Sequence, residues 1–425
     1  MFIRKYFKAF NQNQLLKGSL VLFIGSFAGG ILNYGFNTLM SRMLGPENYG
    51  SFSSLISLVY IIGVPAGTLA IVVAKKVVGF QVKNEISAEK GFLKYILKKS
   101  ALLGLLIFLA FLALSPIVKE FLKINTLWPL VILALDFFIV FIYSIPLGSL
   151  RGRENFFDLS WTGVAVIIIK IFAAFFLVKL GLSVIGAIAS LLVGDFLMMG
   201  ILFLRARIKG KIETIEGASP KLVSFAVPVF FASLCIAALY NVDVILAKHF
   251  LDAANAGYYA VLSLLGKIIF FGTSAIGIVI FPLTAKNHEL GLSNKRILKL
   301  SFLLTLIASG LITLVYFLFP NLIVNLLFGS SYLPIVPYVG LMGVIFIFYS
   351  LINLLVSYAL SCGKTGVTYI LIFGTILQIF LLSMFHSGIL AIVYDMILVM
   401  GIILGGLAIF LMYGKLLRKC KTSAS

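Results

Sequence analysis

Long, unbroken runs of apolar residues constrain this 425-residue chain more than any other feature. Twelve such runs follow one another, each close to the roughly 20 residues that a helix needs to cross a bilayer. Because the runs are continuously apolar and do not alternate with polar residues, they predict helices and exclude a membrane β-barrel. The expected fold class is therefore an all-α polytopic membrane protein. Its predicted spans are 15–40, 49–74, 100–118, 128–150, 159–180, 182–204, 221–248, 257–281, 297–319, 335–360, 366–386 and 388–414.

The composition and the placement of charge support this fold class. Hydrophobic residues make up 61% of the chain and charged residues 11%, which excludes a soluble cytosolic or secreted protein. The net charge of +20 gathers on one side of the predicted spans: with a cytoplasmic N-terminus, 27 of the 34 lysines and arginines lie in inner segments and only five in outer ones. This asymmetry predicts a cell-membrane protein with both termini cytoplasmic. It assigns the positive charge to topology and to anionic headgroups, so no nucleic-acid partner is expected.

An internal repeat divides the twelve predicted spans into two sets of six. The loop Leu-Gly-Pro-Glu-Asn-Tyr-Gly at 44–50 is echoed by Leu-Asp-Ala-Ala-Asn-Ala-Gly at 251–257. Gly-Arg at 152–153 is echoed by Gly-Lys at 363–364. Six spans are an even number, so the two repeats run parallel, and we expect them to enclose a central cavity. The predicted domains are an N-terminal six-helix lobe (1–204), a cytoplasmic linker (205–220) and a C-terminal six-helix lobe (221–425).

The first of these loops carries turn-forming residues. Gly45 and Pro46 are expected to end the first helix, Asn48 to satisfy freed backbone groups, and Gly50 to permit a tight re-entry into the second span. The cluster from Gly63 to Gly67 predicts a kink within that span. A hinge would explain the kink, although close helix packing is the favoured explanation.

Two segments resemble a known family. After a basic N-terminal head, Ser-Arg-Met-Leu-Gly-Pro-Glu-Asn-Tyr-Gly (41–50) and Leu-Arg-Gly-Arg (150–153) are similar to the polysaccharide transporter, O-antigen flippase-like family of the multidrug/oligosaccharidyl-lipid/polysaccharide exporter superfamily. The resemblance implies alternating access by a two-lobed bundle, which moves isoprenoid-diphosphate-linked oligosaccharide to the outer leaflet for surface polysaccharide biosynthesis. The implied partners are that glycolipid, membrane lipids and polysaccharide assembly enzymes. Peptidoglycan-precursor flippases usually carry two further C-terminal helices, so that closer relationship is not expected for a chain ending at Ser425.

Ionisable residues inside the predicted spans are candidate functional residues. A charge at the bilayer centre costs about 2.5–3.5 kcal/mol, so each is expected to face the bundle interior or a wet cavity. Lys267 is expected to contact the diphosphate, because the resemblance places the first two helices of each half along the cavity. Lys170 joins the substrate-binding set, although an ion pair with an aspartate is the favoured explanation for it. The six residues are Asp136, Lys170, Asp195, Asp243, Lys267 and Asp395.

Four basic residues near the predicted span ends complete the substrate-binding candidates. Arg42 and Lys248 lie at the outer ends of the first and seventh spans and would hold the departing diphosphate, although anchoring at the interface explains them equally well. Arg151 and Arg153 would collect the arriving head group on the cytoplasmic side. Positive-inside topology is the stronger explanation for these two.

Three aspartates support an alternative function. Asp136, Asp195 and Asp243 are candidates for coupling to protons or sodium, and Asp243 has the further option of pairing with Lys267. They are compatible with a multidrug organic-cation antiporter of the same superfamily, against which Lys267 argues. A third hypothesis, a non-transporting scaffold for glycan assembly, is disfavoured by the cost of burying six charges. Asp395 is best explained by capping or by snorkelling to the outer surface.

The sequence carries no catalytic constellation. His249, His288 and His386 are far apart and have no zinc spacing. The segment Gly-Lys-Thr at 363–365 lacks the first glycine of a phosphate-binding loop. Neither an enzyme nor a cofactor is expected, and transport would use the substrate gradient, the membrane potential, protons or sodium. An inside-negative potential releases about 2.3 kcal/mol per 100 mV for each negative charge moved outward.

Overall fold

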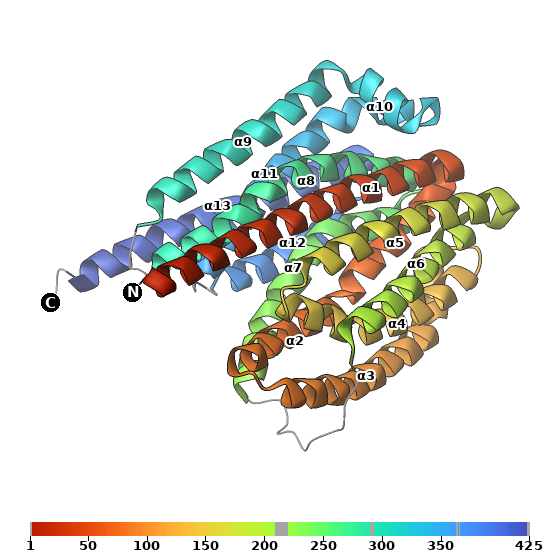
Figure 1. Cartoon of the computed structure of the whole chain (residues 1–425). Coiled ribbons are helices and arrows are strands. Elements are labelled where there is room, and N and C mark those ends of the chain that lie inside the picture. Colours follow the sequence, from red (N-terminus) through yellow and green to blue (C-terminus); the bar gives the residue numbers. More distant parts are fainter. Residues whose placement is uncertain (1, 209–219, 290–292, 363, 365, 423–425) are drawn as a thin grey trace. The chain divides into compact units, whose positions relative to one another are not determined.

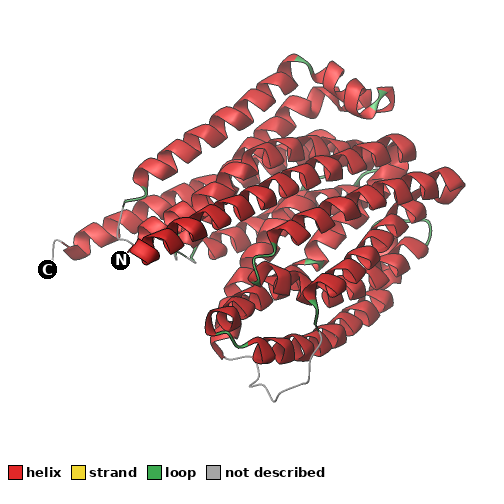
Figure 2. Ribbon diagram, viewed as in Figure 1, coloured by secondary structure: helices red, strands yellow, loops and turns green. Residues whose placement is uncertain are grey.

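The computed structural model describes residues 2–208, 220–289, 293–362, 364 and 366–422. Throughout these residues the regular structure is helical and there is no strand (Figure 2), which confirms the all-α class. In chain order the elements are α1 (Phe2–Ile62), α2 (Val64–Lys83), α3 (Ile86–Phe121), α4 (Trp128–Gly152), α5 (Phe156–Leu177), η1 (Val178–Leu182), α6 (Ser183–Ala206), α7 (Pro220–Phe250), α8 (Ala253–Glu289), α9 (Lys295–Leu318), α10 (Pro320–Phe328), η2 (Ser330–Tyr338), α11 (Val339–Ser361), α12 (Val367–Met384) and α13 (Ile389–Thr422) (Figure 1).

Ten helical stretches in the described part of the chain are long and apolar enough to cross a membrane. Two of them, Ile24–Lys83 and Phe156–Ala206, contain 60 and 51 residues, whereas one crossing takes about 20. Each contains a glycine with positive φ, Gly45 at +70° and Gly181 at +87°, a conformation that side chains with a Cβ disfavour. The protein is thus a multi-pass membrane protein, and the count of twelve spans stays a prediction.

The chain forms two compact units that do not follow its order strictly. Unit 1 comprises residues 1–43 and 62–230, and unit 2 comprises 44–61 and 231–425. The segment 44–61, whose sequence belongs to the first repeat, therefore packs with the C-terminal half. One end of this segment lies beside Gly45, at the kink inside α1. The other end lies beside Gly63, between the end of α1 and the start of α2. Most of the predicted linker and Gly363 lie outside the described residues. The boundaries of the two predicted lobes remain a prediction.

The helix α4 occupies the centre of unit 1, where it packs against α2, α3 and α6 (Figure 1). Two glycines on α4 allow α2 to approach closely. A Cβ on Gly148 would lie 2.5 Å from the carbonyl oxygen of Ala70, and one on Gly152 would lie 2.6 Å from that of Ala74. The close approach fixes the last two turns of α4, which carry Arg151, against α2.

Unit 2 is built around α8 and α11. The helix α9 packs on both and buries a polar stripe that includes Thr305, Ser309 and Thr313, while Leu303 and Leu311 on its other side are exposed. This arrangement is the reverse of a water-soluble helix. It is expected where the surroundings of the exposed face are lipid and where helices associate through small polar residues.

The two echoing loops pack against each other within unit 2. As predicted, the Asn48 side chain donates to a freed backbone carbonyl, that of Leu44, at 3.4 Å. Gly50 lies inside the second part of α1 and makes no tight turn, so the reason predicted for it is wrong. Its missing Cβ serves helix contact, because a Cβ there would lie 2.8 Å from the Gly257 nitrogen, and a Cβ on Gly257 would overlap the carbonyl oxygen of Pro46.

Candidate functional site

Lys267 lies on α8 in the middle of unit 2 and faces the helix α7. Its ammonium lies 4.4 Å from the centroid of the Tyr240 ring and donates to the Asn241 Oδ1 oxygen at 3.4 Å. A cation over an aromatic face is stabilised by the ring quadrupole, and the amide oxygen accepts one of its three donors. Neither partner carries a negative charge, so both hold the lysine without neutralising it.

Asp243 is the acidic neighbour of this lysine. It is 2% exposed, and its Oδ2 oxygen accepts a hydrogen bond of 2.9 Å from the Tyr259 hydroxyl. Its other oxygen has no hydrogen-bond partner among the described residues. The carboxylate interacts electrostatically with Lys267, but in the described part of the chain no carboxylate oxygen lies within 4.0 Å of that ammonium. The structure thus brings the two predicted residues together without a contact ion pair.

Lys170 has an equivalent setting in unit 1. Its ammonium, carried by α5, lies 4.6 Å from the centroid of the Phe36 ring and donates to the Asn33 Oδ1 oxygen at 3.5 Å. It also interacts electrostatically with Asp136 and Asp195, again with no described carboxylate oxygen within 4.0 Å. The predicted partners are neighbours of Lys170, and its direct contacts are neutral.

We call each lysine with its asparagine oxygen and aromatic ring a lysine cradle. The first comprises Lys170, Asn33 and Phe36, and the second comprises Lys267, Asn241 and Tyr240. In both, the asparagine and the ring lie on the helix that opens the repeat. Asn33 and Asn241 are 208 residues apart, close to the offset of the repeated loops, so this offset applied to polar residues would have indicated the two asparagines from sequence. It would not have indicated the lysines, which are 97 residues apart.

Asp136 on α4 and Asp195 on α6 meet beside the first cradle. The two carboxyl groups interact electrostatically with each other. Tyr143, one of the residues that sequence reasoning missed, also interacts with Asp195. Asp136 is 1% exposed, and neither of its oxygens receives a hydrogen bond from any described residue.

The four predicted basic residues at the span ends do not share one environment. Arg42 is exposed in unit 1, whereas Lys248 is 4% exposed in unit 2. Arg151, in the last turn of α4, is exposed. Arg153, directly after α4, is held by protein groups, as described next.

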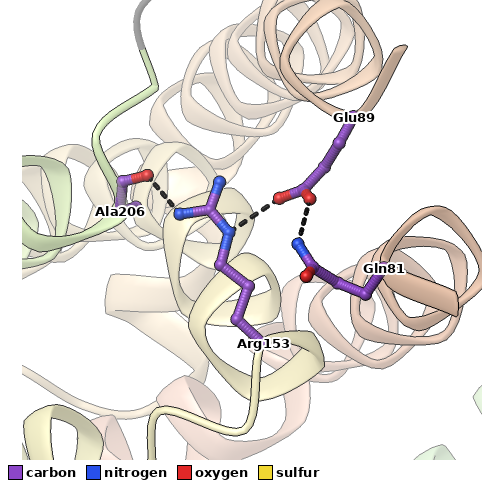
Figure 3. Close-up of polar contacts among 4 residues, drawn as sticks. All are labelled: Gln81, Glu89, Arg153 and Ala206. Atoms are coloured by element: carbon purple, nitrogen blue, oxygen red, sulfur yellow. Dashed lines mark hydrogen bonds and ion pairs between the residues drawn. The ribbon is translucent and has the colours of Figure 1, made fainter. Parts of the chain in front are cut away.

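Arg153 links four helices at one end of unit 1 (Figure 3). Its Nε donates to Glu89 Oε1 at 2.7 Å, and its Nη1 donates to the carbonyl oxygen of Ala206 at 2.6 Å. The other oxygen of Glu89 accepts a hydrogen bond from Gln81 Nε2 at 2.5 Å. The contacts join the ends of α2, α3, α4 and α6, which favours a structural role for Arg153.

The described residues contain no cluster of three or more histidines, cysteines and acids placed to hold a metal. The side chain of His288 and residues Gly363 and Thr365 lie outside the described residues. The described residues offer charge recognition by two cradled ammonium groups and by the carboxyl groups of Asp136, which is buried, and Asp195, which is half-buried.

Comparison with known proteins now places the chain in a family. The model of the family described as polysaccharide biosynthesis protein matches residues 39–337, more than half of the chain. The chain belongs to this family. No curated protein sequence matches it significantly.

Among solved structures, the chain is similar to transporters and a flippase, none of them an enzyme by its description. An inward-facing multidrug resistance MATE family transporter of the MOP superfamily matches with a TM-score of 0.75 and 13% identity, over 93% of this chain and 96% of that chain. The lipid II flippase MurJ in an inward closed conformation matches with a TM-score of 0.76 and 15% identity, over 92% of this chain and 87% of that chain. At these identities the similarity establishes the fold alone.

Proposed function

We propose that the protein is a flippase that moves isoprenoid-diphosphate-linked oligosaccharide from the cytoplasmic to the outer leaflet of the cell membrane, for surface polysaccharide biosynthesis. Membership of the polysaccharide biosynthesis family and the MurJ-like fold support this proposal. The distribution of lysines and arginines supports cytoplasmic termini. In this proposal the lipid tail stays in the bilayer while alternating access of two lobes carries the head group across.

The observation that carries the proposal is the neutral cradling of two membrane-embedded lysines. A lysine inside a span is usually paired with a carboxylate, because an isolated charge in the bilayer is costly. Here the direct contacts of Lys170 and Lys267 are amide oxygens and aromatic rings. Their ammonium groups therefore keep positive charge and free donors for an incoming anion. A diphosphate offers several acceptor oxygens and negative charge to such donors.

Binding of a polyprenyl diphosphate to purified protein tests the anion site directly. We expect this lipid to raise the thermal unfolding temperature of the wild-type protein, because a ligand that binds only the folded state stabilises it. The uncharged polyprenol should not. Lys267→Ala should lose most of the shift and Lys170→Ala part of it.

The matched control is Lys179→Ala, because Lys179 also lies over an aromatic ring, 4.7 Å from the centroid of Phe175, but is exposed. This variant should keep the shift. Equal shifts in Lys267→Ala and Lys179→Ala would remove the second cradle from substrate binding.

A multidrug organic-cation antiporter is the second candidate function. Asp136 supports it, because a buried carboxyl without a hydrogen-bond donor suits coupling to a cation. The two lysines, which have no contact ion pair among the described residues, argue against it, since they repel an organic cation. Under this alternative, cells lacking the protein would become sensitive to drugs while their surface glycans stayed normal.

A further inference from the structure

The short helix α10 follows α9 and carries apolar side chains on two opposite sides. Val324 and Phe328, one turn apart, are 0% and 2% exposed, so this row is buried within unit 2. Leu322 and Leu326, also one turn apart, are 64% and 69% exposed. A surface helix in water would carry polar side chains in this second row. The exposed leucines therefore indicate apolar surroundings on that side of α10.

A row of amides lies beside the exposed leucines. Asn321 and Asn325, each directly before one of the leucines, are exposed as well. Residues four apart are neighbours on a helix surface, so the two amides form a row of their own. Amide groups are costly in hydrocarbon, and exposed leucines are unfavourable in water. A helix that exposes both rows is suited to the boundary between the two media.

The position of α10 along the chain places it at such a boundary. The helix α9 begins with three basic residues, and its 24 residues span about 36 Å, whereas the hydrocarbon core of a bilayer is about 30 Å thick. With the basic end of α9 among headgroups, its other end, where α10 follows (Figure 1), reaches the opposite headgroup region. The exposed side of α9 continues towards α10 through Leu318 and Phe319, which are 61% and 55% exposed. The basic residues are Lys295, Arg296 and Lys299.

Aromatic contacts within unit 2 hold α10 in this place. Phe328 packs against Tyr332 of η2, and Tyr332 packs against Tyr258 near the start of α8, with 6.1 Å between the ring centroids in both pairs. Gly329, between α10 and η2, has a φ of +91°, which favours glycine. The buried row of α10 is thus tied to the end of unit 2 at which α8 begins.

We infer that α10 is an interfacial helix that binds the surface of the lipid bilayer, on the side opposite the basic end of α9. Leu322 and Leu326 insert among the upper parts of the acyl chains. Asn321 and Asn325 contact the headgroups. Because the exposed leucines continue the lipid-facing side of α9, lipid is favoured over a partner protein as the occupant. The inference does not rest on the proposed function.

The chemistry of this segment also defines the kind of lipid surface that it binds. Residues 300–363 contain no lysine, arginine, aspartate or glutamate. Attraction to anionic headgroups therefore contributes nothing, and binding depends on the apolar area that α10 buries. The insertion of α10 should be the same in zwitterionic and in anionic bilayers.

Quenching of a single tryptophan tests the inference in the full-length protein, reconstituted in phosphatidylcholine vesicles. The background carries Trp128→Phe and Trp161→Phe, two exposed positions, and Leu322→Trp supplies the probe. Lipids brominated high on the acyl chain should quench this tryptophan more than lipids brominated near the chain end, because interfacial helices bury their apolar face about 5–10 Å deep. Aqueous iodide should quench it weakly. Replacing a third of the lipid by phosphatidylglycerol should change neither result.

Two further variants in the same background give the scale for this depth. Ile307→Trp, at an exposed position near the middle of α9, should be quenched best by lipids brominated near the chain end. Asn321→Trp, the matched neighbour of Leu322→Trp, should be quenched more by iodide than Leu322→Trp. Leu326→Trp should reproduce the depth of Leu322→Trp one turn later.

Three results would overturn the inference. Quenching of Leu322→Trp by iodide and not by brominated lipid would place α10 in water. The same depth for Leu322→Trp and Ile307→Trp would place α10 in the hydrocarbon core. Protection of Leu322→Trp from both kinds of quencher would show that protein, a second copy included, covers the helix.

Discussion

The ion pair between Arg153 and Glu89 should stabilise unit 1 far more than the pair between Arg205 and Asp158. The first pair has an N–O distance of 2.7 Å, and its side chains are 24% and 2% exposed. The second has a distance of 3.7 Å, and its side chains are 56% and 14% exposed. Removing one partner of a buried pair costs about 3–5 kcal/mol, because the other charge is left without compensation. An exposed pair contributes about 0–1 kcal/mol.

Arg153→Ala is therefore expected to destabilise the protein by about 3 kcal/mol, the lower end of that range because the guanidinium is a quarter exposed. Arg205→Ala, the matched control, should cost less than about 1 kcal/mol. Adding Glu89→Gln to Arg153→Ala should recover part of the loss, because it removes the uncompensated charge while keeping an acceptor for Gln81. This recovery separates an electrostatic penalty from lost packing.

Unfolding by sodium dodecyl sulfate in mixed micelles provides the assay. Tryptophan fluorescence reports on unit 1 in particular, since the two tryptophans of the chain, Trp128 and Trp161, both lie in it. Circular dichroism follows the helices of both units. Equal destabilisation by Arg153→Ala and Arg205→Ala, or a double variant no more stable than Arg153→Ala, would refute the reasoning.

Two further predictions follow from the packing of unit 2 and from the cradles. Gly257→Ala should destabilise the protein by about 1–3 kcal/mol or more in the same unfolding assay, because the new Cβ would overlap the carbonyl oxygen of Pro46. The control is Gly405→Ala, where no atom lies within 4 Å of the new Cβ. It should be neutral or stabilise the protein by up to about 1 kcal/mol. Similar costs at both positions would contradict the close contact between Gly257 and Pro46. Asn241→Asp should place a carboxylate beside Lys267. The affinity of the protein for polyprenyl diphosphate should then fall at least about tenfold, which corresponds to ~1.4 kcal/mol. The reason is that the Coulomb energy between two unit charges 4 Å apart is about 4 kcal/mol at an effective dielectric constant of 20. Unchanged affinity in Asn241→Asp, measured by titration, would show that Lys267 does not bind the anion.

The sequence predicted the fold well where the bilayer decides the structure. Continuous apolar runs predicted helices because a backbone in lipid must satisfy its own hydrogen bonds. The predicted bounds agree within four residues for α4, α5, α6, α7, α9, α11 and α12. The helix α3 begins 14 residues before its predicted span, and α8 and α13 each end eight residues after theirs. The runs did not reveal α10 and η2, which are short and follow or contain prolines. The internal repeat predicted that the segment 44–61 belongs to the first lobe, and this stays a prediction; in the structure the segment packs within unit 2. Which unit buries a helix depends on close contacts such as that of Gly50 with Gly257, which composition does not encode.

The candidate site was predicted only in part, because ionisable residues in spans are easy to find and their partners are not. Lys170 is held by Asn33, 137 residues away, and Arg153 by Glu89, 64 residues away. Such pairs follow from tertiary packing. The hydrogen bond between Tyr259 and Asp243 could have been predicted from the sequence. Both residues lie eight positions from Leu251, in the loop between α7 and α8, and therefore at a similar height along these two helices.

Transfer of a fluorescent polyprenyl-diphosphate oligosaccharide between the leaflets of reconstituted vesicles tests the central claim most directly. The wild-type protein should transfer the glycolipid, Lys267→Ala should not, and Lys179→Ala should retain transfer at equal insertion. In the same vesicles, efflux of an organic cationic dye is followed under proton and sodium gradients. Dye efflux without glycolipid transfer would contradict the account, and the protein would then be a cation antiporter whose chemistry lies in its aspartates.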